Sequence, residues 1–324
     1  MVRTTQSALM LAAARNTLRW PGVPAVAGWL TKYSAAGLRM LVGDAGVSAH
    51  SGPKLAASPS MAAQQGGSIL QAGLLIIGDE ILSGAVSDSN AAWLGKMLHL
   101  RGVKLCRVEV VGDCEEEIVD SVHRIRERAA GGPVFTSGGI GPTHDDITYA
   151  AIGAAFGRPL TVHEETLRRM TAHYERKHLE VNAMRRRMAT LPEGAEVLFT
   201  DGTWVPLAIV EGVHILPGIP RLFQAMVSAH QERFQGKCFF SIHLYTNTGE
   251  GDLAAPLAEI SARNPQVRIG SYPKVTSAVG GVEGSDDDWR VHLVVEGRDE
   301  DDVRLASEEI RRSVKIINTI AGTA

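Results

Sequence analysis

Residues 133–148 read PVFTSGGIGPTHDDIT, and they decide the fold because an apolar strand breaks here into a glycine-rich loop that leads to a helix. In an open sheet of parallel strands, ligands bind beyond the carboxyl ends of the strands, where glycines let the backbone approach a phosphate. The candidate phosphate-binding residues of this loop are Ser137, Gly138, Gly139, Gly141, Pro142 and Thr143. The stretch therefore predicts an α/β fold with a phosphate cradle at a strand end.

Two aspartates, Asp145 and Asp146, follow the glycines directly. Carboxylates repel a bare phosphate, but a divalent cation between them accepts oxygen ligands from both groups. The pair therefore indicates metal-assisted phosphoryl or nucleotidyl chemistry. The simpler alternative is that one aspartate caps the next helix and that the glycines only turn the chain. His144 offers a proton carrier inside the loop, although a lone histidine is more often a bystander.

Two earlier strands also end in acidic residues. The apolar run 72–78 is followed by Asp79 and Glu80, and the run 104–112 is followed by Asp113. Because the carboxyl ends of parallel strands meet at one edge of a sheet, we expect these acids to lie together. The predicted cation ligands are Asp79, Glu80 and Asp146, for Mg²⁺, Mn²⁺ or Co²⁺, and the predicted catalytic acids are Asp113, Asp145 and Asp146. Pro217 and Gly218, in the later loop LPGIP, complete the predicted nucleotide-binding set.

From Gln71 onward, apolar runs alternate with helical segments, which is typical of a mostly parallel sheet covered by helices. The predicted strands of this part lie at 72–78, 104–112 and 133–139, and the predicted helices at 87–102, 113–132, 146–157, 163–178 and 181–189. Asp88 or Asn90 is the candidate cap of the first helix, and Asp113 that of the second. Pro220 is well placed at the start of a later helix. We expect this first domain to span residues 71–235.

Beyond Gly236 the pattern changes to β-α-β-β-α, which predicts a small second α/β domain over residues 236–318. The predicted elements are strand 238–246, helix 251–263, strands 266–273 and 289–297, and helix 300–317. Residues 280–288, GGVEGSDDD, are expected to form a solvent loop between the last two strands.

Residues 1–70 differ from the rest of the chain. No acidic residue precedes Asp44, whereas arginine, lysine, serine and alanine are frequent, as in organelle import signals. The Ser-, Ala-, Gly- and Pro-containing run 48–67 is typical of a flexible linker. We therefore expect a transit-peptide-like leader for the chloroplast or mitochondrion. The alternative is a disordered leader without an address on a cytoplasmic protein.

Composition excludes several classes of function. The net charge of −3 gives no basic excess for nucleic acid, and no apolar run is long enough to cross a membrane. The three cysteines have neither CxxC nor metal-ligand spacing, so neither a disulfide framework nor a structural zinc site is expected. The expected partners are a small-molecule nucleotide or pterin substrate and further copies of the chain in a homo-oligomer.

Several motifs in the same order carry a family resemblance: GDEILSG, DSN, VGD, SGGIGPTHDDIT, PEGAEVL and LPGIP. Together they resemble the MoaB/Mog-type molybdopterin-binding domain, in the branch of the CinA nucleotide pyrophosphatases and the N-terminal half of eukaryotic FAD synthases. The resemblance covers residues 72–234 and implies a three-layer α/β/α domain. IGSYP at 269–273, in its β-α-β-β-α unit, is similar to the segment that comes after that domain in the FAD-synthase branch.

The resemblance also implies an activity. In relatives that adenylylate molybdopterin, the residues matching Asp113 and Asp146 are the functional acids, and the glycine loop holds phosphate or pterin. In the CinA and FAD-synthase branch, the domain resembles a metal-dependent hydrolase of the pyrophosphate in ADP-ribose or FAD. Pyrophosphate hydrolysis is the leading prediction. The alternatives are a molybdopterin adenylyl transfer step and a non-catalytic flavin or pterin nucleotide binder.

The chain departs from these relatives in three ways. It ends at Ala324 without the half that transfers adenylyl to FMN, so FAD synthesis is not expected. The amidase domain present in many CinA proteins is also missing. Relatives usually carry an asparagine before the glycine at the position where this chain has Thr200, Asp201 and Gly202. The resemblance therefore does not assign the residues on the substrate-proximal side of the pocket.

Overall fold

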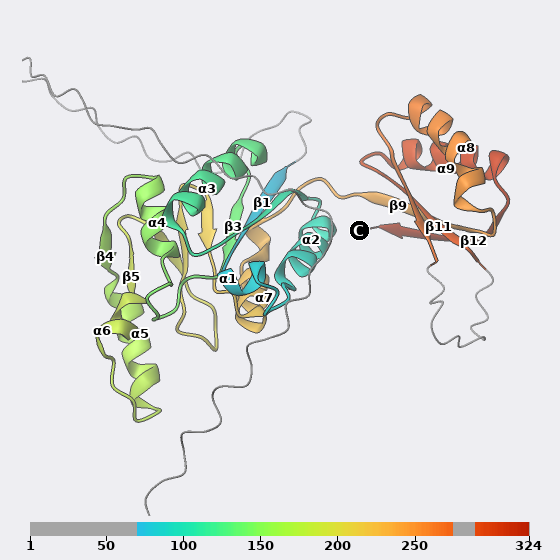
Figure 1. The fold of residues 1–324 in the computed structure, drawn as a ribbon. Coiled ribbons are helices and arrows are strands. Elements are labelled where there is room, and N and C mark those ends of the chain that lie inside the picture. Colours follow the sequence, from blue (N-terminus) through green and yellow to red (C-terminus); the bar gives the residue numbers. More distant parts are fainter. Residues whose placement is uncertain (1–69, 275–288, 324) are drawn as a thin grey trace, which may run out of the picture. The chain divides into compact units, whose positions relative to one another are not determined.

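The structure is a computed structural model that describes residues 70–274 and 289–323 (Figure 1). The predicted leader, apart from residue 70, and the predicted loop 280–288 lie outside these residues. Within the described ranges, no helix is both long enough and apolar enough to cross a membrane.

The first part of the fold is built on a six-stranded sheet with strand order β2-β1-β3-β8-β7-β6. Its parallel strands are β2 (Lys104–Val111), β1 (Gln71–Ile77), β3 (Val134–Ser137) and β8 (Val213–Ile215). β7 (Leu207–Val210) and β6 (Glu196–Leu198) complete it as antiparallel neighbours. The mostly parallel sheet is as predicted, and its four parallel strands all end at the same edge.

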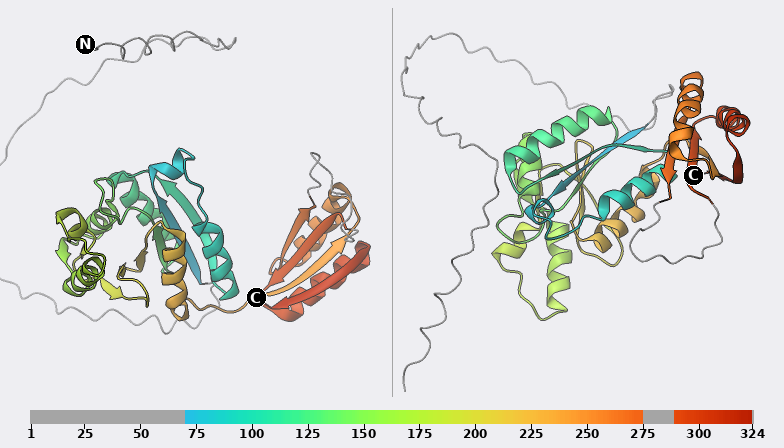
Figure 2. Two further views of the ribbon diagram at one scale, coloured as in Figure 1. Left: turned by 90° about the horizontal axis from the view of Figure 1, so that it is seen from below. Right: turned by 45° about the vertical axis from the view of Figure 1, so that its right-hand side comes forward.

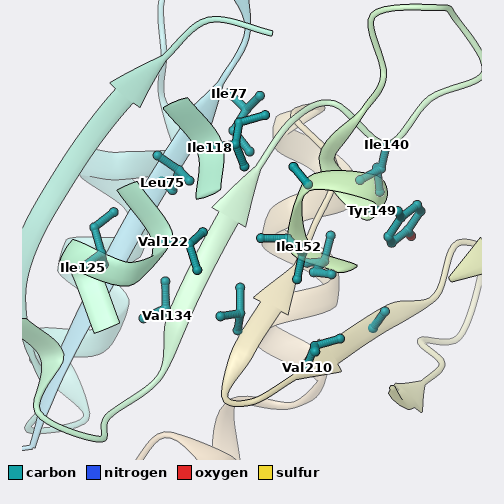
Figure 3. Packing of buried hydrophobic residues seen from close by; sticks show 14 of the residues in the cluster. Leu75, Ile77, Ile118, Val122, Ile125, Val134, Ile140, Tyr149, Ile152 and Val210 are labelled. Atoms are coloured by element: carbon teal, nitrogen blue, oxygen red, sulfur yellow. The ribbon is translucent and has the colours of Figure 1, made fainter. Parts of the chain in front are cut away.

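The burial pattern of strand β1 shows why this part of the fold has three layers, with helices on both faces of the sheet. Its side chains alternate between two buried clusters, because successive residues of a strand point to opposite faces. Leu75 and Ile77 pack with α3 (Glu115–Ala129) and α4 (Thr148–Ala155), as Figure 3 shows. Ala72, Leu74 and Ile76 pack on the other face.

Helices α2 (Asn90–Leu100) and α7 (Pro220–Ala229) cover that other face, through Leu94, Leu98 and Phe223. Figures 1 and 2 show the two pairs of helices on opposite sides of the sheet. The predicted α/β/α layering is confirmed. A four-residue helix, α1 (Asp79–Leu82), directly follows β1.

A smaller lobe follows α4 in the chain. It contains β4 (Leu160–Val162) paired with β5 (Thr190–Pro192), and the helices α5 (Glu164–Glu175) and α6 (Ala183–Arg187). Both helices are shorter than predicted, and α6 has only five residues. The turn between them includes His178 at φ 55°, a left-handed conformation that ends regular helix. The 3-10 helix η1 (Gln231–Arg233) follows α7.

The second part of the fold is a four-stranded antiparallel sheet with strand order β10-β11-β9-β12. Its elements are β9 (Phe240–Thr246), α8 (Glu250–Arg263), β10 (Arg268–Pro273), β11 (Val291–Gly297), α9 (Glu300–Ser313) and β12 (Ile316–Thr323). The predicted β-α-β-β-α order is confirmed, and β12 adds a strand.

The prediction that the last helix continues to residue 317 is wrong. Helix α9 ends at Ser313, and Val314 is already extended. The β-branched residues Ile316, Ile317 and Ile320 favour a strand, and β12 pairs with β9 along its length. Pairing with a distant strand therefore overrides the helical pattern at this end.

Both helices of the second part cover one face of its sheet (Figure 1). Alternate residues of β11, Val291, Leu293 and Val295, pack there against the side chains of α8 and α9. The residues between them point to the other face. Neither α8 nor α9 lies on that face.

Candidate functional site

The four parallel strands bring the predicted site residues to one edge of the first sheet. Gly78, which follows β1, donates its N–H to the carbonyl of Val111 at the end of β2 (3.1 Å). Gly138, which follows β3, donates to the carbonyl of Leu216 after β8 (3.1 Å). The ends of β1 and β2 are therefore neighbours, as are the ends of β3 and β8, in agreement with the strand-end argument.

Asp113 is joined to the neighbouring strand end. The N–H of Asp79 donates to Asp113 Oδ2 at 3.1 Å. The prediction that Asp113 caps helix α3 is wrong, since Cys114 occupies the N-cap position without a side-chain bond. The helix begins with three glutamates instead, whose charges suit its N-terminus. Asp113 is therefore not used as a helix cap, and it lies at the edge of the sheet where the parallel strands end.

Burial raises the pKa of the Asp113 carboxyl above its ordinary value, and the hydrogen bond from Asp79 lowers it in part. The negative charges of Asp79, Glu80 and Asp145 raise it further. Desolvation and like charge both disfavour the ionised form of a carboxyl. Acids that follow two other strand ends therefore act electrostatically on Asp113.

Asp146 bonds back into the glycine loop. Its Oδ1 accepts from the N–H of Gly141 (2.6 Å), and its Oδ2 accepts from the N–H and the hydroxyl of Thr143. Neither aspartate caps α4, because Ile147 is the N-cap residue and makes no side-chain bond. Two N–H groups that the sequence assigns to a phosphate are thus occupied by this carboxylate. A phosphate would reach them only after Asp146 turned away.

Gly138 is the glycine on which this loop depends. Its φ is 116°, and a Cβ placed there would lie 2.1 Å from the carbonyl oxygen of Ile77. Its own carbonyl accepts from the Thr148 hydroxyl (2.9 Å), which ties the loop to α4. Only a residue without a side chain lets β3 turn this close to β1.

Asn90 is a site residue that the sequence reasoning missed. Its Nδ2 donates to Ser137 Oγ (2.9 Å) and to the carbonyl of Gly218 (3.0 Å), so one amide links the start of α2 to the end of β3 and to the loop after β8. Its Oδ1 is buried and has no hydrogen-bond partner in the described part of the chain. The motif DSN at residues 88–90 pointed to this residue, but helix capping was the only role predicted for Asn90. Neither candidate is the N-cap, which is Ser89 without a side-chain bond, but the Asp88 carboxylate one residue earlier accepts from the N–H groups of Asn90 and Ala91.

Arg187 was missed as well. From the end of α6, its guanidinium donates to the carbonyl of Thr143 (3.1 Å) and to that of Asp146 (3.3 Å). The side chain therefore holds the acidic end of the glycine loop from outside. The run MRRR at 184–187 marked a basic segment, yet no local pattern shows that it meets a loop some forty residues earlier.

The other predicted residues differ in exposure. Ser137 and Pro217 are buried, whereas Asp79, Glu80 and Gly218 are exposed. The side chain of His144 is 98% exposed and lies 3.8 Å from Asp145, so no neighbouring group orients it. That position suits the bystander interpretation of His144.

The acids of this edge do not by themselves form a complete site for a divalent cation. No three His, Cys, Asp or Glu side chains gather closely enough to hold a metal ion anywhere in residues 70–274 and 289–323. Mg²⁺-like cations, however, commonly bind through one or two carboxylates and take their remaining oxygens from water and substrate phosphates. Asp79 and Asp113 fit such a shared site, in which the substrate supplies part of the coordination.

Comparison with known proteins gives matches on both parts of the fold. Residues 73–234 match the family described as "Probable molybdopterin binding domain", and residues 238–320 match "FAD synthase, middle domain". Protein TK1472 of Thermococcus kodakarensis is 34% identical over 245 residues, which are 72% of this chain and 97% of that protein.

Two further similarities involve CinA. A CinA-like protein of Salinibacter ruber is 37% identical over 176 residues, which are 52% of this chain and 42% of that protein. The solved structure of the protein CinA from Thermoplasma acidophilum is 28% identical, with a TM-score of 0.46. It covers 51% of this chain and 98% of that chain. The family match over residues 73–234 therefore bears out the resemblance that the sequence motifs carry.

Proposed function

Since the chain belongs to the probable molybdopterin binding domain family, as its motifs predict, we propose that it hydrolyses the pyrophosphate bond of a dinucleotide such as FAD or ADP-ribose. The observation that carries this proposal is the contact between two strand ends, where Asp79 donates its N–H to Asp113. This pair of carboxylates lies beside a glycine loop at the edge where α/β sheets bind ligands.

Asp79 and Asp113 would hold a divalent cation together with the substrate's phosphate oxygens, and Glu80 lies next to them. Bound Mg²⁺, Mn²⁺ or Co²⁺ would withdraw charge from the two phosphates. We also assign Asp113 to orient the attacking water, because a carboxylate oxygen that is left free by the cation can accept a hydrogen bond from that water. Attack on phosphorus then releases AMP and a second phosphate ester.

We assign a structural role to Asp146 and Arg187, which hold the glycine loop in its conformation. Asp146 gathers the N–H groups of Gly141 and Thr143, and Arg187 holds the carbonyls of the same turn. That Asp146 binds a cation, and that Asp145 acts in catalysis, stay predictions. Asn90 fixes the spacing between the β3 and β8 ends, where the substrate's ring or sugar would lie.

The family description names a molybdopterin binding domain and so favours a pterin ligand, for which the second candidate function is a molybdopterin adenylyl transfer step. The match of residues 238–320 to a FAD synthase middle domain favours a flavin nucleotide instead. The full chain is to be incubated with FAD, ADP-ribose and adenylyl-molybdopterin, with and without each cation, while AMP release is followed. AMP from the first two only supports the proposal. AMP from adenylyl-molybdopterin alone would identify a pyrophosphatase of a pterin nucleotide, and adenylyl-molybdopterin with pyrophosphate, formed from ATP and molybdopterin, would support the second candidate. Binding without turnover supports a non-catalytic role.

A further inference from the structure

The helix-free face of the second sheet carries a group of aromatic and histidine rings. His292 on β11 pairs with Tyr245 on β9 and with Tyr272 on β10. His243 and Trp289 lie next to them, and we call these five residues the ring ladder. Uncovered faces of antiparallel sheets are ordinarily polar, so five rings on one such face need an explanation.

The rings of the ladder are ordered against one another. Those of Tyr245 and His292 are stacked, with centroids 4.7 Å apart and an angle of 9° between their planes. His243 stacks on His292 at 5.1 Å, and the two are hydrogen bonded between Nδ1 and Nε2 at 2.9 Å. Burial and the neighbouring His243 lower the pKa of His292, so the charged form of this ring is disfavoured.

Tyr272 extends the ladder to the edge strand with an open ring face. A Cβ on Gly270 would lie 2.9 Å from Cε2 and 3.0 Å from the hydroxyl of Tyr272. The tyrosine ring therefore lies over the bare backbone of Gly270, and 49% of the residue is exposed. A ring laid against the strand in this way presents a flat surface to solvent.

Cross-strand ring pairs also stabilise sheets, and that role alone would account for Tyr245 and His292. It does not account for Tyr272, whose ring is half exposed and packs along its own strand. Flat rings on a sheet of this kind are the usual means of stacking planar ligands. A nucleic-acid strand is disfavoured because its affinity comes from phosphate neutralisation, and the chain has a net charge of −3.

We propose that the ring ladder is a second binding site, which takes a planar heteroaromatic ring of the flavin, pterin or purine kind by stacking on Tyr272, with the ring of His292 beside it (centroids 6.0 Å apart). The site uses no residue of the strand-end edge in the first sheet. It therefore stands whether or not the chain hydrolyses a pyrophosphate.

Two uncharged probes test this site in the full chain: riboflavin, followed by fluorescence anisotropy, and adenosine, followed by equilibrium dialysis. Neither carries a phosphate, so the acid-lined edge is not engaged through one. We expect saturable binding of at least one probe. Tyr272→Ala should weaken it at least about fivefold, as the loss of a stacking ring does, while Tyr272→Phe should keep it.

The control is Leu305→Ala, which truncates a residue that is 50% exposed on α9, on the helix-covered side. Binding that persists in this variant and in Asp113→Asn, but weakens in Tyr272→Ala and His292→Ala, supports the ladder site. Which probe binds identifies the ring. The proposal is overturned if neither probe binds, if both ladder variants bind normally, or if only a single-stranded oligonucleotide binds.

Discussion

At the scale of single residues, the two adjacent aspartates have different surroundings. Asp146 accepts three hydrogen bonds within its loop, whereas the Asp145 side chain is 54% exposed. The sequence places both in one acidic pair and gives no means of telling them apart, because the distinction arises from how residues 141–146 turn back on themselves. The structure separates them through the N–H groups of Gly141 and Thr143.

Replacing Asp146 by asparagine should loosen the loop. The new amide can accept one bond from the loop but turns an N–H toward another N–H, so one donor is left without an acceptor. We expect the free energy of unfolding to fall by about 1–3 kcal/mol, with faster hydrogen exchange at Gly141 and Thr143. The matched change, Asp145→Asn, should stay within about 0.5 kcal/mol. Equal effects of the two changes would contradict the assigned role.

At the scale of elements, the turn from β3 into its loop depends on Gly138. Alanine there would need a φ of 116° and would bring Cβ 2.1 Å from the Ile77 carbonyl oxygen. We expect Gly138→Ala to cost about 3 kcal/mol of unfolding free energy in urea titrations. Gly251→Ala, at an open position in helix α8, should be neutral or stabilising by up to about 1 kcal/mol. A mild effect at Gly138 would show that the turn is not tight.

Strand β8 contributes a pH dependence through His214. Burial against Phe135 and Phe234 lowers the pKa of His214 to about 4. The unfolded chain takes up this proton near pH 6.5, whereas the folded chain does not until about pH 4. Folding stability is therefore lost as the pH falls through that window, and between pH 7 and pH 5 the loss is about 2 kcal/mol.

The variant His214→Phe keeps a ring between the two phenylalanines and removes the titrating group. Urea unfolding of both proteins at pH 7 and pH 5 measures the difference in slope. The variant should lose about 2 kcal/mol less than the natural chain over this interval. The same loss in both proteins would show that His214 does not titrate in this way.

Sequence patterns predicted elements best where local and long-range preferences agree. The continuous apolar run of β1 is buried on both faces, and Pro220 starts α7 as its fixed φ favours. The patterns failed where contact with a segment distant in sequence determines the local structure. Ile316 and Ile317 belong to strand β12 and not to the end of α9, because β12 pairs with β9. Asn90 and Arg187 reach the site only through the tertiary fold, so their roles have no local signature.

At the scale of the whole molecule, the two parts of the fold present different chemistry. The first has exposed carboxylates beside a glycine loop at the carboxyl ends of parallel strands, and the second has stacked, largely uncharged rings on an antiparallel sheet. The first suits charged phosphates with a cation, and the second suits the flat ring of a nucleotide or its product.

The central claim is that Asp113 serves metal-dependent cleavage of a pyrophosphate, and AMP release from FAD or ADP-ribose tests it most directly. With Mg²⁺, Mn²⁺ or Co²⁺ the full chain should release AMP, and Asp113→Asn should lower the rate at least about 100-fold. Asp120→Asn, on the exposed side of α3, is the matched control and should leave the rate unchanged. Equal rates in the chain and in Asp113→Asn, or no AMP from either substrate with any cation, would contradict the account.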